Sequence, residues 1–525
     1  MSAVLAAAVP VSTAGGGFGF PILPAVVVAP AAFAVVVALV PRRLTGLARA
    51  LGITGSLVTL GLALAMAVRF RTGVPGYQFV TAHEWIGTLG VSWKLGVDGI
   101  SVLLVPVTAV LFGAALVGTR VDQDPKAYMA WMLVLEAACL GSFLALDLLL
   151  FFLFFELTLP PMYFLIARWG GARGGYAAIK FFLYTFAGSA LMLIALIAVA
   201  VLHERDFGRL TFDVIALTTQ QHLSSGVGAV IFLGFAAAFL VKVPVFPLHT
   251  WLPDAQVEAP TGASMILAGV MFILGTYGLV RYCMELLPKA SVDLAPLMLT
   301  LGAVSIVYGF VVAVVQRDLK RMIAYTLVAD LGVIVVGLFG FTSQGLSGGV
   351  YQMVNHGISM GAMFMMIGWI IDRTGTADLR EMGGLQARTP IMAAVFMVVT
   401  LSAVGVPGLN GFIGEFLLLL GTFVTRRWWA VVATTGVILA ALVFLWAYQQ
   451  VFHGRLKGRA LGAVVADLGW RELLAVAPLV FLILLLGVYP RPFLERINPS
   501  AGRVLDRVTT VTGHAQPALA AGRTP

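Results

Sequence analysis

The stretch FLVKVPVFP, residues 239–247, sets the terms of the fold, because it embeds Lys242 in an apolar run that prolines then interrupt. Two carboxylates stand in similar surroundings: Glu156 within FFLFFELTLPP and Glu415 within VPGLNGFIGEFLLLL. A charge at the middle of a bilayer costs about 2.5–3.5 kcal/mol on insertion scales. Such groups are tolerated where they pair with one another or contact water, as they do along ion and proton paths. We therefore expect ionisable side chains kept hydrated inside a membrane.

The composition places nearly all of the chain in the bilayer. Of 525 residues, 60% are hydrophobic and 11% are charged, whereas soluble proteins carry about 25% charged residues. Cys139 and Cys283 lie apart in apolar runs without a CxxC spacing, which excludes a cysteine-ligated cluster or zinc site in this chain. The net charge is +9, but no run of Lys or Arg alternates with aromatic residues, so nucleic-acid binding is not expected.

Apolar windows of about 20 residues, each long enough for a membrane-spanning helix, recur along the chain. We count fourteen, and the loops between them are short. The sequence therefore predicts an all-α polytopic membrane protein built as one bundle of about 14 transmembrane helices. Two stretches fall outside the spans: residues 72–97, expected as a polar and aromatic loop, and a polar tail after Pro490.

Basic residues divide unevenly between alternate loops of this arrangement. One set of loops carries 17 Lys and Arg residues, and the other carries nine before the C-terminal tail. The positive-inside rule assigns the richer set to the cytoplasm. We therefore expect a multi-pass protein of a bacterial plasma (inner) membrane with both termini on the extracytoplasmic side.

Lys242 and Glu415 each lie beside a helix that Pro or Gly interrupts, in the predicted seventh and twelfth helices. The two helices are five spans apart, and because five is odd the second copy crosses in the opposite direction. Paired interrupted helices of this kind indicate an inverted repeat with a transport site between the copies. We predict helices 1–3 in residues 1–125, a first repeat (helices 4–8) in 126–290, a second, inverted repeat (helices 9–13) in 291–454, and the last helix and tail in 455–525.

Four long motifs carry a resemblance to a known family: FFELTLPPMYFLIARWGG, LVKVPVFPLHTWLPDAQVEAPTGASMILAG, QRDLKRMIAYTLVADLG and VPGLNGFIGEFLLLLGTF. They resemble subunit M of proton-pumping NADH:quinone oxidoreductase (respiratory complex I), a member of the antiporter-like subunit family. The resemblance runs from about Asp98 to about Phe452. A glutamate at position 415, where subunit L typically has a lysine, favours subunit M.

The resemblance implies fourteen helices with two inverted five-helix repeats and an antiporter-like proton channel. It also implies that FMN, iron–sulfur clusters and quinone reside in partner subunits and that no cofactor or metal binds in this chain. Neighbouring antiporter-like subunits, other membrane and peripheral subunits, and lipids are the expected partners. The alternatives are a subunit of a multi-chain sodium/proton antiporter, and a scaffold whose buried charges only dock neighbouring helices.

Four residues match family positions on the expected proton path. Glu156 and Lys242 match a buried carboxylate and lysine, and movement of Glu156 would switch Lys242 between holding and releasing a proton. The alternative is a static ion pair. Glu415 matches the terminal proton carrier, unless its role is structural. His356, in QMVNHGISMGAMFMM, matches a relay between the broken helices, although a lone buried histidine is often a hydrogen-bonded core residue.

Five further residues are weaker candidates. Lys180 matches the family, but it could instead extend its ammonium group toward the membrane surface. His249, Asp254 and Glu258 cluster after the seventh helix, where capping or loop closure explains the two carboxylates equally well. Glu136 is a further buried carboxylate one span before Glu156, and it could modulate Lys180 or Glu156.

The chain also departs from the family pattern. Ile273 stands where a lysine is frequent, and Asp330, Gly375 and Gln256 replace histidines. A direct relay from lysine to lysine is therefore interrupted at Ile273. We predict that water, His356 and Asp330 bridge the two halves, although Asp330 could instead be the partner of a nearby cation.

Overall fold

Each apolar run forms a helix, because a bilayer offers no water to satisfy peptide N–H and C=O groups. The structure is a computed structural model that describes residues 18–220, 223–457 and 466–513. Twelve helical stretches in that part are long and apolar enough to cross a membrane. They are α1 (Ile22–Leu39), α2 (Thr45–Arg69), α4 (Pro125–Leu144), α5 with α6 (Leu148–Leu157 and Leu159–Trp169), α7 (Gly174–Phe207), α9 (Ser225–Lys242), a composite helix (Thr261–Glu285), α14 (Ala295–Val314), α15 (Leu319–Leu338), α16 (Ser343–Thr374), α19 (Arg427–Phe452) and α20 (Trp470–Val488).

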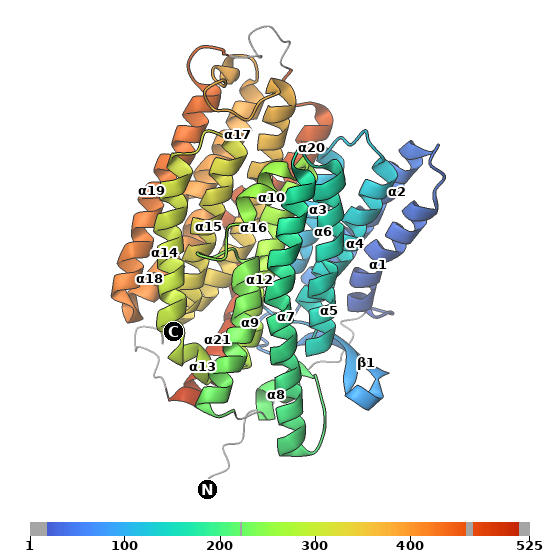
Figure 1. The fold of residues 1–525 in the computed structure, drawn as a ribbon, viewed down its shortest axis with the longest axis vertical. Coiled ribbons are helices and arrows are strands. Elements are labelled where there is room, and N and C mark those ends of the chain that lie inside the picture. The colour runs from blue at the N-terminus through green and yellow to red at the C-terminus, as the bar shows by residue number, and fades with distance from the viewer. Residues whose placement is uncertain (1–17, 221–222, 458–465, 514–525) are drawn as a thin grey trace.

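Three shorter apolar helices complete the bundle: α3 (Leu104–Gly118), α17 (Pro390–Val404) and α18 (Asn410–Thr425). With α3 as one crossing and α17 and α18 together as another, the described chain has fourteen, which confirms the predicted helical membrane fold. The helices pack side by side, with α1 and α2 at one edge of the bundle and α18 and α19 at the other (Figure 1). Two short connecting helices are α10 (Leu252–Glu258) and η4 (Leu385–Ala387).

Two crossings are broken where the sequence predicts it. The first helix piece, α9, ends at Lys242, and an irregular segment with Pro244 and Pro247 leads to α10. In the second, α17 ends at Gly405, whose φ of +79° favours glycine, and α18 begins at Asn410. Both breaks therefore expose peptide groups within the bundle.

The composite helix Thr261–Glu285 lies inside the bundle and is not uniformly α-helical. It consists of α11 (Thr261–Ile266), a π-helical segment η2 (Leu267–Met271), α12 (Phe272–Gly278) and a second π-helical segment η3 (Leu279–Glu285). Its apolar window is fully buried. A helix surrounded on all sides by others can contribute side chains to both halves of the molecule.

One end of the bundle, which we call the hairpin face, carries the elements that hydropathy did not predict. Strand β1 (Gln78–Ile86) pairs antiparallel with β2 (Val91–Val97) around a short turn, η1 (Gly87–Leu89). The polar and aromatic loop expected over residues 72–97 therefore contains a two-stranded hairpin, within a fold that is mostly helical. The helices α8 (Val214–Gln220) and α13 (Pro288–Asp293) lie at the same end (Figure 1).

The expected polar tail is wrong for its described part, because residues 491–512 form an amphipathic helix, α21 (Arg491–Thr512). Its buried residues recur at helical spacing: Ile497, Ala501, Val504, Leu505 and Val508. Phe18, the first described residue, contacts Phe79 of β1, so both ends of the described chain lie on the hairpin face. The terminal residues 1–17 and 514–525, to which the orientation of the termini refers, lie outside the described part.

Candidate functional site

Lys242 is the last residue of α9 and is 1% exposed. Its Nζ donates a hydrogen bond to Thr158 Oγ1 at 2.8 Å and lies 4.4 Å from the centre of the Phe155 ring. Among the described residues no carboxylate lies within 4.0 Å of it. The ammonium group is therefore buried against a hydroxyl and an aromatic face, without a direct ion-pair partner.

Glu156 lies between these two contacts in sequence, directly after Phe155 and one residue before the end of α5. It is partly buried, and its Oε1 is a buried atom without a hydrogen-bond partner. Glu156 and Lys242 interact electrostatically, although they form no ion pair. The structure thus brings the two groups near each other without closing an ion pair between them.

A cluster of charged groups lies on the other side of the first break, around Asp254 in the first turn of α10. Its carboxylate contacts three cations: Lys180 at 2.8 Å, Arg321 at 3.3 Å and Arg173 at 3.5 Å. Arg173 is 60% exposed at its side chain and Lys180 only 22%. The cluster thus leads from solvent toward the interior, and Lys180 points to Asp254 rather than freely to the membrane surface.

Of the other weak candidates, Glu258 shares Arg173 with Asp254, while His249 and Glu136 contact other residues. Glu258 accepts a hydrogen bond from the backbone N–H of Arg173 at 2.9 Å, which is loop closure. His249 is 3% exposed and packs against the rings of Phe246 and Tyr308. Glu136 accepts from Ser56 Oγ of α2 at 3.1 Å. In the described part of the chain, Glu136 has no ion pair with Lys180.

Glu415 lies in the second turn of α18, directly against the second break. A Cβ added to Gly405 would lie 2.5 Å from Glu415 Oε2, so the glycine makes room for the carboxylate. Gln352 Nε2 donates to Glu415 Oε1 at 3.2 Å, and Asn355 Nδ2 donates to Gln352 Oε1 at 3.2 Å. Asn355 also donates to the carbonyl of Asn410 at 2.7 Å, which fastens α16 to the start of α18. Amides therefore hold Glu415, with no cation beside it in the described region.

Asp330 of α15 and His356 of α16 join Glu415 around a cavity of about 10 Å³. This volume is about the minimum that holds one water molecule. Asp330 Oδ2, Asn355 Oδ1 and His356 Nε2 are buried atoms without a hydrogen-bond partner. The structure thus brings together the three residues that the sequence assigned to a relay near the second break.

The two ionisable clusters are separated by tightly packed apolar groups. Ile273 is 2% exposed, and a Cβ added to Gly357, next to His356, would lie 2.8 Å from Ile273 Cδ1 and 2.6 Å from the carbonyl oxygen of Gly269. The composite helix and α16 are therefore in backbone contact at this level. Ile273, where the family often has a lysine, fills the space between the halves.

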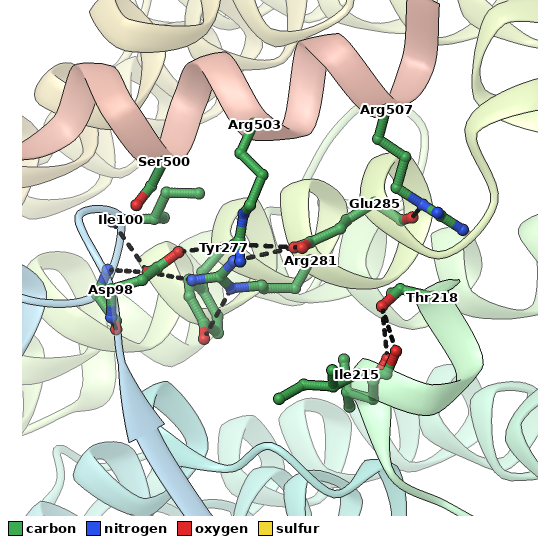
Figure 2. Close-up of polar contacts among 12 residues, drawn as sticks. Asp98, Ile100, Ile215, Thr218, Tyr277, Arg281, Glu285, Ser500, Arg503 and Arg507 are labelled. Carbon is green, nitrogen blue, oxygen red and sulfur yellow. Dashed lines mark hydrogen bonds and ion pairs between the residues drawn. The ribbon is translucent and has the colours of Figure 1, made fainter. Parts of the chain in front are cut away.

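Sequence reasoning missed a buried ion network on the hairpin face (Figure 2). Asp98 forms ion pairs with Arg281 of η3 and with Arg503 of α21, the latter at 3.0 Å. Glu285 pairs with Arg281 at 2.9 Å and with Arg503 at 3.2 Å. Burial disfavours ionisation of Asp98, but the two guanidinium groups outweigh burial and hold the pKa of this carboxyl below its ordinary value. The amphipathic spacing of α21 was the available signal for its docking.

Groups of three or more His, Cys, Asp or Glu side chains that could hold a metal ion do not occur among the described residues. Cys139 and Cys283 are both buried and unpaired. The chemistry that these residues offer is therefore the holding and passing of protons by Lys, Glu, Asp and His side chains.

Comparisons with known proteins agree with this arrangement. Residues 145–441 match the family model described as NADH:quinone oxidoreductase/Mrp antiporter, TM. Subunit M of NADH-quinone oxidoreductase from Rhodobacter capsulatus is 42% identical over 87% of this chain and 90% of its own length. A chain in the structure of respiratory complex I from Thermus thermophilus with bound NADH is 32% identical, with a TM-score of 0.83 over 93% of this chain and 99% of that chain.

A chain of the Mrp complex from Dietzia sp. shares the fold, with a TM-score of 0.78, over 94% of this chain and 56% of that chain. Its identity of 22% shows the fold alone. The respiratory subunits are more similar in sequence, at 32–42% identity, and are covered over 90–99% of their own length, which separates this chain from the sodium/proton antiporter alternative. The chain belongs to the subunit M family of NADH-quinone oxidoreductase, within the antiporter-like membrane proteins.

Proposed function

We propose that the chain translocates protons as the antiporter-like subunit M of an NADH:quinone oxidoreductase, with Lys242 as the central carrier. The observation that carries the proposal is the position of Lys242. Its ammonium group is buried at the break of a membrane-spanning helix, interacts with Glu156 electrostatically, and has no ion-pair partner among the described residues. Ionisable side chains inside a membrane are rare and mark ion and proton paths.

Protons reach Lys242 from the side of α10. Asp254 attracts cations and contacts Lys180, which is intermediate in exposure between Arg173 and the buried Lys242. The gradient of exposure supports uptake from this side. The three cations around Asp254 mark this side as the entrance to the first half.

Glu156 controls the protonation of Lys242. A carboxylate that approaches a buried ammonium stabilises its charge, and withdrawal of the carboxylate favours release of the proton. Because Thr158 and Phe155 hold Lys242 when Glu156 is apart, the lysine has a defined position in the open arrangement of the pair. Release then proceeds toward the second half.

The proton passes to Glu415 through transient water. Ile273 blocks a permanent connection, while Asp330, His356 and Glu415 surround a space for one water molecule. Hydration of the Ile273 region would link Lys242 to this cluster only when the packing loosens. Such a gate couples proton transfer between the halves to conformational change.

The redox chemistry belongs to partner subunits, which would carry FMN, iron–sulfur clusters and the quinone site. The exposed apolar surfaces of the bundle face lipids and neighbouring antiporter-like subunits. The distribution of basic residues supports a bacterial plasma membrane location with the hairpin face and both termini on the extracytoplasmic side. The boundaries of the two repeats, 126–290 and 291–454, remain part of the proposal.

The test replaces the two partners in the intact complex. Lys242→Met removes the charge but keeps an unbranched side chain, and Glu156→Gln keeps the shape of the carboxylate. Each is expected to lower NADH-driven proton pumping by about tenfold or more, the size of a lost acid–base group. Glu495→Gln, which changes an exposed partner of Arg491 in α21, is the control. Normal pumping by both variants in an assembled complex would refute the proposal.

A further inference from the structure

We propose that a two-layer seal closes the hairpin-face end of the first half and prevents protons on Lys242 from leaking directly to that face. The aromatic layer consists of Phe151, Phe155, Phe239 and Tyr282. The ion layer consists of Asp98, Arg281, Glu285 and Arg503. The seal is a passive barrier, so it does not depend on the proposed pumping route.

The aromatic layer lies directly beside Lys242. The Phe155 ring carries the Lys242 ammonium on its face, and its centre is 5.9 Å from that of Phe239. Phe239 is in turn 6.1 Å from Tyr282, whose ring lies 4.2 Å from Phe151. Tyr282 and the three phenylalanines are each at most 2% exposed. Three of these four contiguous rings, from α5, α9 and η3, are phenyl groups, so the layer itself offers water only the Tyr282 hydroxyl.

The ion layer follows along the composite helix, on the side of the rings away from Lys242. Along this helix, Gly275 packs against Val243, the residue after Lys242, and Gly278 packs against the Phe239 ring. Arg281 and Glu285 follow Gly278 by about one and two helical turns. Arg503 reaches down from α21 to Asp98 and Glu285, and Ser500 of the same helix accepts from the N–H of Gly99 (Figure 2). The helix α21 therefore covers the ion layer on the hairpin face.

Solvent reaches this layer from the hairpin face. A cavity of about 200 Å³ lies between the start of α9 and the helices α13 and α21, and its lining includes Gly228, Lys289 and Arg507. Arg507 also donates through Nε to the carbonyl of Glu285 at 2.6 Å. From Gly228 to Lys242, α9 rises by roughly 21 Å at 1.5 Å per residue. The two layers occupy this interval.

Two kinds of barrier in series suit a proton carrier. A dry aromatic layer excludes water chains, because dewetted constrictions block conduction, and the four paired charges of the ion layer fill the path between that layer and the hairpin face. A purely mechanical role for the ion layer, fastening α21 to the bundle, predicts no change in proton permeability when one ion pair is lost. Proton leak therefore distinguishes the seal from a fastening.

The chain supplies its own reporters, because both of its cysteines are buried: Cys283 follows Tyr282 of the aromatic layer, and Cys139 lies in α4. Cys283 is in η3 next to Tyr282, and Cys139 is close enough to Lys242 to interact with it electrostatically. In the intact complex a water-soluble methanethiosulfonate reagent is expected to label neither. Arg503→Gln should expose Cys283 only, and Arg503→Gln with Tyr282→Ala should expose both.

The functional measurement uses the complex in sealed phospholipid vesicles, without NADH and with an imposed pH gradient. Arg503→Gln and Tyr282→Ala are each expected to raise passive proton leak modestly, and the double variant several-fold over either. Arg491→Gln is the matched control, because Arg491 lies in the same helix and pairs only with exposed Glu495. Arg503→Lys, which keeps the charge, should restore most of the tightness.

Two results would overturn the seal. One is an assembled double variant whose leak equals that of the wild type. The other uses a reference cysteine at Gly228 on the cavity wall, where an added Cβ makes only ordinary contacts. If Cys283 in an otherwise unchanged chain reacted with the reagent as fast as this reference cysteine, the ion layer would not exclude water. Failure of pumping in Lys242→Met would leave both results unaffected.

Discussion

The two broken helices carry their ionisable groups in opposite ways. Lys242 is the last residue before the first break and lies against an aromatic ring and a hydroxyl. Glu415 follows the second break, in the second turn of α18, and lies among side-chain amides. The shared helix arrangement therefore does not copy the chemistry of one half into the other.

This difference suits directional transfer. The first half offers a buried cation near a carboxylate; in our proposals, movement of this carboxylate sets the charge, and rings and ion pairs close the far end. The second half offers two carboxyl groups and an imidazole around a space for one water molecule. In this arrangement a proton released by Lys242 finds acceptors in the second half and none toward the hairpin face at the end of its own half.

Of the three variants that test this comparison, Glu415→Gln in the second half is expected to have the largest effect on pumping. The glutamine can still accept from Gln352, so the packing is kept while the proton carrier is lost. Proton pumping, measured in vesicles with a fluorescent pH probe, is expected to fall about tenfold. Glu415→Asp, which keeps an acid, should retain most of it. Equal pumping by the Gln variant and the wild type would show that the second half only supports the first.

Asp254→Asn tests proton uptake into the first half, because it removes the carboxylate that joins three cations. Pumping is expected to fall several-fold, with a larger deficit at alkaline pH, where protons are scarce and uptake limits the rate. Asp122→Asn, at an exposed carboxylate on another loop, is the control. A deficit that is the same at every pH would place Asp254 outside the uptake step.

A double-mutant cycle addresses the smallest effect, the junction at Ile273. His356→Ala should slow pumping a few-fold in the wild type but very little in an Ile273→Lys background, where the lysine offers another route. The expected coupling is about 1 kcal/mol, within the range for neighbouring residues. Ile273→Leu provides the cycle without a new charge. Additive effects would mean that position 273 and His356 do not act in the same proton-transfer step.

Hydropathy predicted the spans and both breaks, because each depends on local sequence: a run of apolar residues, or Pro and Gly within one. The buried charges were equally readable, since any Lys or Glu in such a run must be accommodated. The cluster of Asp330, His356 and Glu415 came from resemblance, and the structure places the three around one cavity.

The hairpin face was missed for a physical reason. Asp98 meets partners 183 and 405 residues away in sequence, and no local pattern announces such pairs. The spacing of Ile497, Ala501, Val504, Leu505 and Val508 was a local signal for α21, but the many charges of this segment concealed it. The separation of Glu156 from Lys242 depends on side-chain packing and could not be deduced from composition.

The π-helical segments of the composite helix give its middle an unusual freedom. A π turn closes i→i+5 hydrogen bonds and so holds one residue more than an α turn. If that surplus residue migrated along the helix, α12 would swivel while Thr261 and Glu285 stayed anchored. Ile273 would then rotate away from Gly357, and this rotation of α12 alone would open the passage between the halves.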